Sequence, residues 1–121
     1  MNKRPTIFID TKKWLIRIHK NTLYMLGCPQ YIELLVNPES MRVAIRVSPV
    51  KTNFTHKINW DRLCGKNSCE ITCKYFIIKL ISTCGAAGAI RSYKLAGEYS
   101  SEENIVSFKF SETFGKSGDE L

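Results

Sequence analysis

The chain has 121 residues, of which 44% are hydrophobic and 24% charged, and its formal net charge is +7. This size and apolar content predict one globular domain over residues 1–121. No apolar run approaches the roughly 20 residues that cross a bilayer and no signal peptide opens the chain, so we expect no membrane contact and a cytoplasmic location. Five cysteines, an odd number, argue against a secreted disulfide framework.

Charge is distributed unevenly along the chain. Residues 1–97 contain 16 Lys and Arg against 5 Asp and Glu, whereas residues 98–121 contain 2 against 6. A basic body attracts polyanions, above all nucleic acid in a cytoplasm. Residues 111–121 are expected to form an acidic, flexible tail. The alternative is a solvated surface whose charge has no functional meaning.

The pattern from residue 14 onward predicts a strand, a short helix and a hairpin. Apolar and polar residues alternate over Trp14–His19, which is the period of a half-buried strand. Lys20–Thr22 offers an N-cap, and Gly27 ends a single helical turn. Tyr31–Val36 and Met41–Val47 are predicted to pair as a hairpin across a turn that contains proline.

Two further segments flank this unit. Thr6–Asp10 is predicted to be a short buried strand that precedes it. Residues 48–66 are a connecting segment, with a short strand at Lys57–Trp60 and a turn of helix at Asp61–Leu63. We expect Trp60 to anchor the core, because large aromatic side chains mostly bury their area.

The second part of the chain repeats the order strand, helix, hairpin. The predicted elements are a strand at Cys69–Thr72, a helix at Cys73–Cys84, a strand at Ile90–Ala96, a polar loop at Gly97–Asn104 and a strand at Ile105–Phe110. The helix carries one apolar stripe, which consists of Phe76, Ile77, Leu80, Ile81 and Cys84.

An internal repeat of residues 14–47 in residues 69–110 follows from this order of elements. The predicted fold class is therefore α+β and mostly β. We expect a small barrel-like domain built from two strand–helix–hairpin units.

The first unit resembles a known family. The resemblance lies in the run Ile16-Arg17-Ile18-His19-Lys20, in Leu23, in Leu26-Gly27, and in the strands at Ile32–Val36 and Val43–Val47. These residues are similar to those of the AbrB/SpoVT transition-state regulators. The resemblance implies a swapped-hairpin barrel, in which two such units interlock and a basic face grips DNA. It implies that one chain can supply both units, with a homodimer as the other arrangement. The whole chain is also similar to short uncharacterised proteins encoded on mobile elements of gut clostridia.

Basic side chains are predicted on the outward face of this unit. The candidate nucleic-acid-binding residues are Lys13, Arg17, His19, Lys20, Arg42 and Arg46. We expect the three arginines and Lys20 to lie on one exposed face, because phosphate contacts need cations on a rigid surface. Duplex DNA is the expected ligand, since no aromatic stacking motif of RNA-binding modules is present. The alternative is a strand that alternates charges for solubility alone.

Other chemistry has less support in the sequence. Cys64, Cys69 and Cys73, with Cys84 and His56 nearby, are spaced more widely than the ligands of structural zinc sites usually are, so we expect no metal. No phosphate-binding loop, paired-carboxylate pattern or nucleophile–histidine motif is present, and we expect neither an enzyme nor a cofactor.

Two functions are compatible with these observations. The expected function is DNA binding by a small regulatory protein of a bacterial or mobile-element genome. The alternative is a non-enzymatic interaction module, whose exposed strand edges or basic face bind an acidic partner protein.

Overall fold

A computed structural model describes residues 4–84 and 92–109. Over these residues the chain forms eight strands and three helices. In chain order they are β1 (Thr6–Asp10), β2 (Leu15–His19), α1 (Lys20–Met25), β3 (Tyr31–Asn37), β4 (Arg42–Ser48), β5 (Thr55–Lys57), α2 (Trp60–Leu63), β6 (Ser68–Thr72), α3 (Lys74–Cys84), β7 (Ser92–Ser100) and β8 (Ile105–Lys109). The predicted acidic tail at 111–121 lies outside the described residues.

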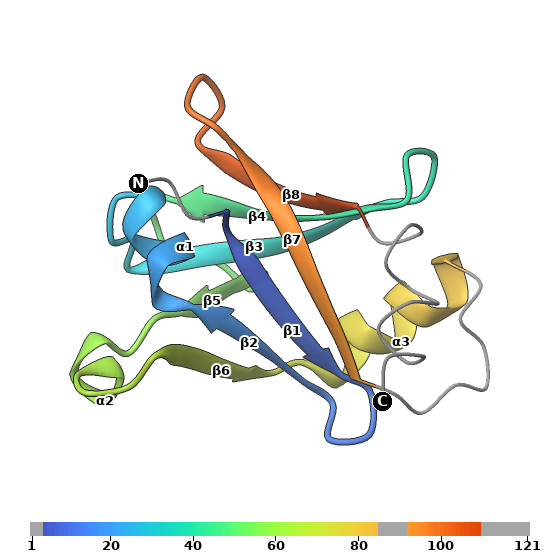
Figure 1. The fold of residues 1–121 in the computed structure, drawn as a ribbon, viewed down its shortest axis with the longest axis horizontal. Coiled ribbons are helices and arrows are strands. Elements are labelled where there is room, and N and C mark those ends of the chain that lie inside the picture. Colours follow the sequence, from blue (N-terminus) through green and yellow to red (C-terminus); the bar gives the residue numbers. More distant parts are fainter. Residues whose placement is uncertain (1–3, 85–91, 110–121) are drawn as a thin grey trace.

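All eight strands join one antiparallel sheet in the order β5-β3-β4-β8-β7-β1-β2-β6. The sheet curls into a nearly closed barrel whose two ends are β5 and β6 (Figure 1). The predicted class, α+β and mostly β with a barrel-like domain, is therefore confirmed. Among the described residues, no helix combines the length and the apolar character needed to cross a bilayer.

The core fills the barrel with the inward residues of the alternating strands. Ile16 and Ile18 of β2 are fully buried, and so are Leu23 of α1 and Ile77 and Leu80 of α3. The two helices lie at opposite ends of the barrel in Figure 1. The apolar stripe predicted for the longer helix thus packs against the core over the residues whose side chains are described. Full burial of each such side chain contributes about 1.5–3 kcal/mol.

The first helix begins differently from the prediction. His19, not a residue of Lys20–Thr22, is the N-cap, and its Nδ1 accepts a hydrogen bond from the backbone N–H of Asn21 (3.1 Å). Thr22 is instead fully buried, and its hydroxyl bonds the backbone of Thr6. Gly27, with φ +85°, follows the helix as predicted.

The predicted strand at Lys57–Trp60 is displaced toward the N-terminus. β5 ends at Lys57, and Trp60 begins α2, which Asn59 caps by accepting the backbone N–H of Arg62 (3.1 Å). Trp60 packs against the core, donates its Nε1–H to the Pro29 carbonyl (2.9 Å) and stacks on the Tyr24 ring. Its predicted role as a core anchor is confirmed.

The polar loop predicted from Gly97 to Asn104 is wrong over its first half. β7 runs on to Ser100, and only Ser101–Asn104 form the turn to β8. Glycine and polar residues favour a loop on local grounds, but Gly97 here lies opposite Phe108 of β8, whose ring packs where a side chain would stand. Residues 85–91, including the predicted start of this strand, lie outside the described residues.

The sheet pairing is symmetric between the two halves of the chain. Let β1, β2, β3 and β4 correspond to β5, β6, β7 and β8. The β1–β7 pair then corresponds to the β5–β3 pair, and the β3–β4 pair to the β7–β8 pair. Each of the β2–β6 and β4–β8 pairs corresponds to itself, because it joins two equivalent strands. Only the β1–β2 pair lacks a counterpart in the described part of the chain, because β5 and β6 are the ends of the sheet. A repeat of residues 14–47 in 69–110 stays a prediction.

Gly97 allows a specific test of this packing. A Cβ at this position would lie 2.3 Å from the Ser107 carbonyl oxygen and 2.6 Å from the Phe108 ring. We expect Gly97→Ala to lower the free energy of unfolding by about 1–3 kcal/mol, measured by urea denaturation. Ala96→Ser, at the exposed neighbouring position, is the control and should stay within about 0.5 kcal/mol of the parent. Equal effects of the two changes would contradict the tight contact.

Candidate functional site

The predicted basic residues fall on two strands that lie far apart in the sheet. Lys13, Arg17, His19 and Lys20 belong to β2 or its ends, whereas Arg42 and Arg46 belong to β4. Three strands, β8, β7 and β1, separate β4 from β2. In a nearly closed sheet of eight strands, this separation places the two groups on opposite sides. The expectation of a single face is therefore wrong.

The physical reason lies in the strand pairing. The β3–β4 hairpin does not fold back onto β2; β4 pairs with β8 of the other half, and β2 pairs with β6. Elements close in sequence are thus carried to different parts of the barrel, which local patterns do not reveal.

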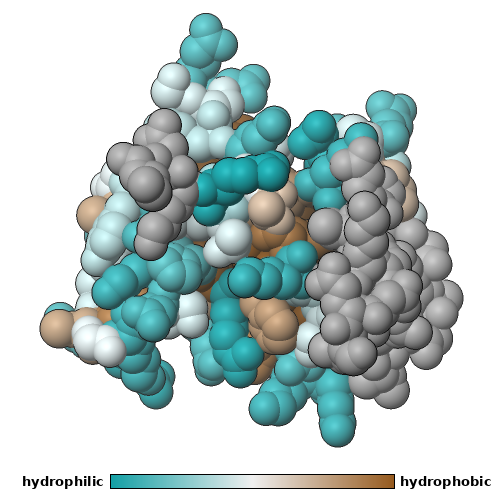
Figure 2. All heavy atoms as spheres, viewed as in Figure 1, coloured by the Kyte–Doolittle hydropathy of each residue, from teal (hydrophilic) through white to brown (hydrophobic). Residues whose placement is uncertain are grey.

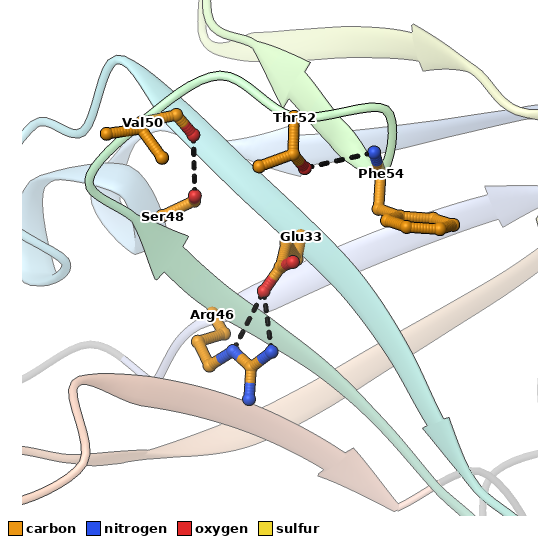
Figure 3. Close-up of polar contacts among 6 residues, drawn as sticks. All are labelled: Glu33, Arg46, Ser48, Val50, Thr52 and Phe54. Atoms are coloured by element: carbon orange, nitrogen blue, oxygen red, sulfur yellow. Dashed lines mark hydrogen bonds and ion pairs between the residues drawn. The ribbon is translucent and has the colours of Figure 1, made fainter.

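On the β4 side, both arginines already have polar partners. Arg46 donates two hydrogen bonds to Oε1 of Glu33 on β3, from Nε (2.9 Å) and Nη2 (2.6 Å), as Figure 3 shows. Nη1 of Arg42 donates to the Ser107 hydroxyl at 3.5 Å. Arg42 also lines a groove of about 340 Å³ together with Arg4, Lys109 and Glu98. This side therefore carries cations and carboxylates in mixed order.

The segment after β4 is fixed by its own turn contacts. The hydroxyl of Ser48 donates to the Val50 carbonyl (2.7 Å), and the Thr52 hydroxyl accepts the backbone N–H of Phe54 (3.1 Å), both visible in Figure 3. These bonds lead the chain into β5, the strand that forms one end of the sheet.

On the β2 side, Arg17 is held by two neighbours. Its Nε donates to Oε2 of Glu70 on β6 at 2.6 Å, and its guanidinium lies 5.3 Å from the centroid of the Phe8 ring. Lys13 lies in the turn before β2, where Asp10 Oδ1 accepts its backbone N–H (2.9 Å). The side chain of His19 is used as the cap of α1.

Three further cations, which the sequence-based candidates did not include, adjoin this group. Lys57, Arg62 and Lys66 line a hollow of about 480 Å³ between β5, α2 and β6, together with Glu70. They belong to the segment interpreted as a connection, and no local pattern marks them. Their position depends on β6 lying beside β2.

Together these residues define what we call the β6 basic surface. Its members are Lys13, Arg17, Lys20, Lys57, Arg62 and Lys66. Lys20 adjoins Lys66, because its backbone N–H bonds the carbonyl of Asn67 (2.9 Å). The carboxylates placed among these cations are Glu70 and, on α2, Asp61. Figure 2 shows hydrophilic side chains along the lower edge of the molecule, over α2 and β6.

The positive field of this surface acts on Glu70. Its pKa is lowered, mainly by the hydrogen bond from Arg17; desolvation, the next largest effect, opposes this, and the charges of Arg17, Lys66 and Lys13 lower the pKa further. Glu70 is half-exposed, so the pair with Arg17 contributes little to stability. The pair matters because Glu70 neutralises part of the positive charge of the β6 basic surface.

Two of the described thiols, Cys69 and Cys73, are held in the protonated, weakly nucleophilic form. Burial raises the pKa of Cys73 to about 11, and burial followed by the charge of Glu70 raises the pKa of Cys69. Cys28 and Cys64 are exposed free thiols. Over residues 4–84 and 92–109, no cluster of three His, Cys, Asp or Glu side chains could hold a metal ion.

Comparisons with known proteins give no relative from which a role can be transferred: no family model, curated protein or solved structure matches the chain.

His56 of β5 provides a pH-dependent test of the barrel wall. Burial lowers its pKa below the ordinary value of 6.5. Below that pH the unfolded chain therefore binds more protons than the folded one, and stability falls as the pH falls. We expect His56→Gln to reduce the slope of the free energy of unfolding against pH between pH 7 and 5, as measured by urea denaturation. One full proton would change this slope by about 1.4 kcal/mol per pH unit, and we expect only part of that value because His56 is half-exposed. Identical slopes would show that His56 titrates alike in both states.

Proposed function

We propose that the protein binds duplex DNA through the β6 basic surface, as a small regulatory protein. The observation that carries the proposal is the surface itself, which presents six Lys and Arg side chains around two carboxylates. Cations on a rigid sheet and its adjoining helix can match phosphates that repeat along a duplex. The arginines of this surface, Arg17 and Arg62, are the residues suited to read guanine edges.

The proposal also keeps the resemblance to the AbrB/SpoVT regulators as its guide, since that resemblance implies an exchange of strands between two units. β1 of the first half pairs with β7 of the second, and β3 of the first half pairs with β5 of the second. In this proposal these pairs correspond to the interlocking of two units that the resemblance implies. In this proposal one chain supplies both units, so DNA binding does not require a second copy.

The salt dependence of binding tests the role of the cations. We expect Lys66→Ala to weaken binding of all duplex sequences alike and to reduce the slope of log K against log[salt] by about one unit, because one phosphate contact is lost. Fluorescence anisotropy of a labelled duplex at several salt concentrations measures this slope. Lys79→Ala, at an exposed position of α3 outside the surface, is the matched control. A reduced salt slope for Lys79→Ala and not for Lys66→Ala would place the DNA interface outside the β6 basic surface.

The Arg17–Glu70 pair permits a test in the opposite direction. Glu70→Gln removes a negative charge from the surface and frees the Arg17 guanidinium, so DNA affinity should rise about two- to fivefold. Glu33→Gln is a closely matched control, because it frees Arg46 in the same way on the opposite side of the barrel. A rise with Glu33→Gln and none with Glu70→Gln would assign DNA binding to the β4 side instead.

A further inference from the structure

The two end strands of the sheet each have one unpaired edge. In the described part of the chain, β6 pairs with β2 on one side and β5 pairs with β3 on one side. Natural sheets usually cover or blunt such an edge, because its free N–H and C=O groups can pair with another chain. In the other half of the barrel the corresponding strands, β1 and β2, pair with each other, so the equivalent edges are covered there.

The register identifies the free backbone groups of β6. The backbone N–H of Lys20 bonds the Asn67 carbonyl, and that of Cys73 bonds the Trp14 carbonyl, both at 2.9 Å. Hydrogen-bonded pairs alternate along an antiparallel ladder. Residues 67, 69, 71 and 73 therefore turn their backbone groups toward β2. Those of Ser68, Glu70 and Thr72 point to the open edge, which offers three N–H and three C=O groups.

The same reasoning applies to β5. The N–H of Ile58 bonds the Gln30 carbonyl (2.8 Å), which places the backbone groups of His56 toward β3. The backbone groups of Thr55 and Lys57 accordingly point away from β3. The N–H of Thr55 already bonds the Thr52 carbonyl (3.4 Å), so the regular row of outward donors and acceptors is that of β6.

A hollow lies between these edges. It has a volume of about 480 Å³ and is lined from one side by Lys57, Arg62 and Lys66 and from the other by Ser68, Glu70 and Thr72. The lining residues of β6 include all three whose outward backbone groups have no partner within residues 4–84 and 92–109. Three cations against one carboxylate, itself bonded to Arg17, give the hollow a positive charge.

We propose that this hollow binds an extended acidic segment of a partner protein, which pairs with β6 as an additional strand. Backbone hydrogen bonds to Ser68, Glu70 and Thr72 supply the attachment, and Lys57, Arg62 and Lys66 select acidic side chains. A basic segment would be repelled by the same cations, which explains how an open edge can be selective. The bound strand would partly close the barrel between β6 and β5.

This site extends beyond the proposed DNA binding and does not depend on it. Both ligands would use Lys57, Arg62 and Lys66, and we expect them to compete. Only the peptide needs the free backbone edge of β6, because phosphates can be held by side chains alone. Protection of the edge amides therefore distinguishes the two ligands.

Amide hydrogen exchange measured by NMR on the full chain tests the proposal. The probe is a capped peptide of about eight residues, in which Glu alternates with Val, long enough to span a typical strand. At saturation, the amides of Ser68, Glu70 and Thr72 should exchange at least about tenfold more slowly than in the free protein. The amides of Cys69 and Ile71 already bond β2 and serve as internal references.

Two control peptides separate charge from strand pairing. A peptide with Lys in place of Glu should give no protection, and the Glu–Val peptide with alternate amides N-methylated should lose it. The proposal is overturned if no protection appears at about 5 mM peptide, a concentration high enough for weak association. It is also overturned if the N-methylated peptide protects equally well, or if a DNA duplex protects the same three amides.

Variants of the protein provide a second measurement. Lys57→Glu and Lys66→Glu should each weaken peptide binding about fivefold or more, whereas Lys79→Glu on α3 should leave it unchanged. Thr72→Pro removes one free N–H of the edge and leaves the β2 ladder intact, so it should weaken the peptide but not the duplex. Retained exchange protection at Cys69 and Ile71 verifies that this variant folds. Unchanged peptide affinity in folded Thr72→Pro contradicts strand addition.

Discussion

Backbone pairing between β2 and β6 is the contact on which the rest of this structure depends. It joins the first half of the chain to the second, and it buries Ile16 opposite Ile71 inside the barrel. It also places Glu70 beside Arg17. The same pairing places Lys57, Arg62 and Lys66 near the basic residues of β2. Because β2 occupies one edge of β6, the other edge is left open.

The exchange of strands between the halves has a direct consequence for charge. Arg17 and Arg46 are on the same strand–helix–hairpin unit, but each pairs with a carboxylate on a different side of the barrel. The β4 side carries Arg4, Arg42, Arg46 and Lys109 among Glu33 and Glu98, whereas the β6 basic surface carries six cations around Glu70 and Asp61. The surface proposed to bind DNA is therefore one that neither half could form alone.

The two proposed ligands share cations but require different geometry. A duplex needs positive charge spread over a surface, and its affinity falls steeply with salt. An extended acidic segment needs the free N–H and C=O groups of Ser68, Glu70 and Thr72 as well as charge. Competition for Lys57 and Lys66 would make DNA binding sensitive to an acidic partner. In these proposals, regulation would act through a strand edge of the kind that natural sheets usually cover or blunt.

The sequence by itself determined most of the local elements and the class of fold. Alternation over β2, the glycine after α1 and the apolar stripe of α3 were legible, because each depends on neighbours within a few residues. The tertiary structure alone decided that Gly97 lies within a strand, where Phe108 fills the space of a side chain. It also decided that Arg17 and Arg42 lie on opposite sides and that Lys57, Arg62 and Lys66 join the surface. Those outcomes depend on pairing between strands distant in sequence, which no local pattern encodes.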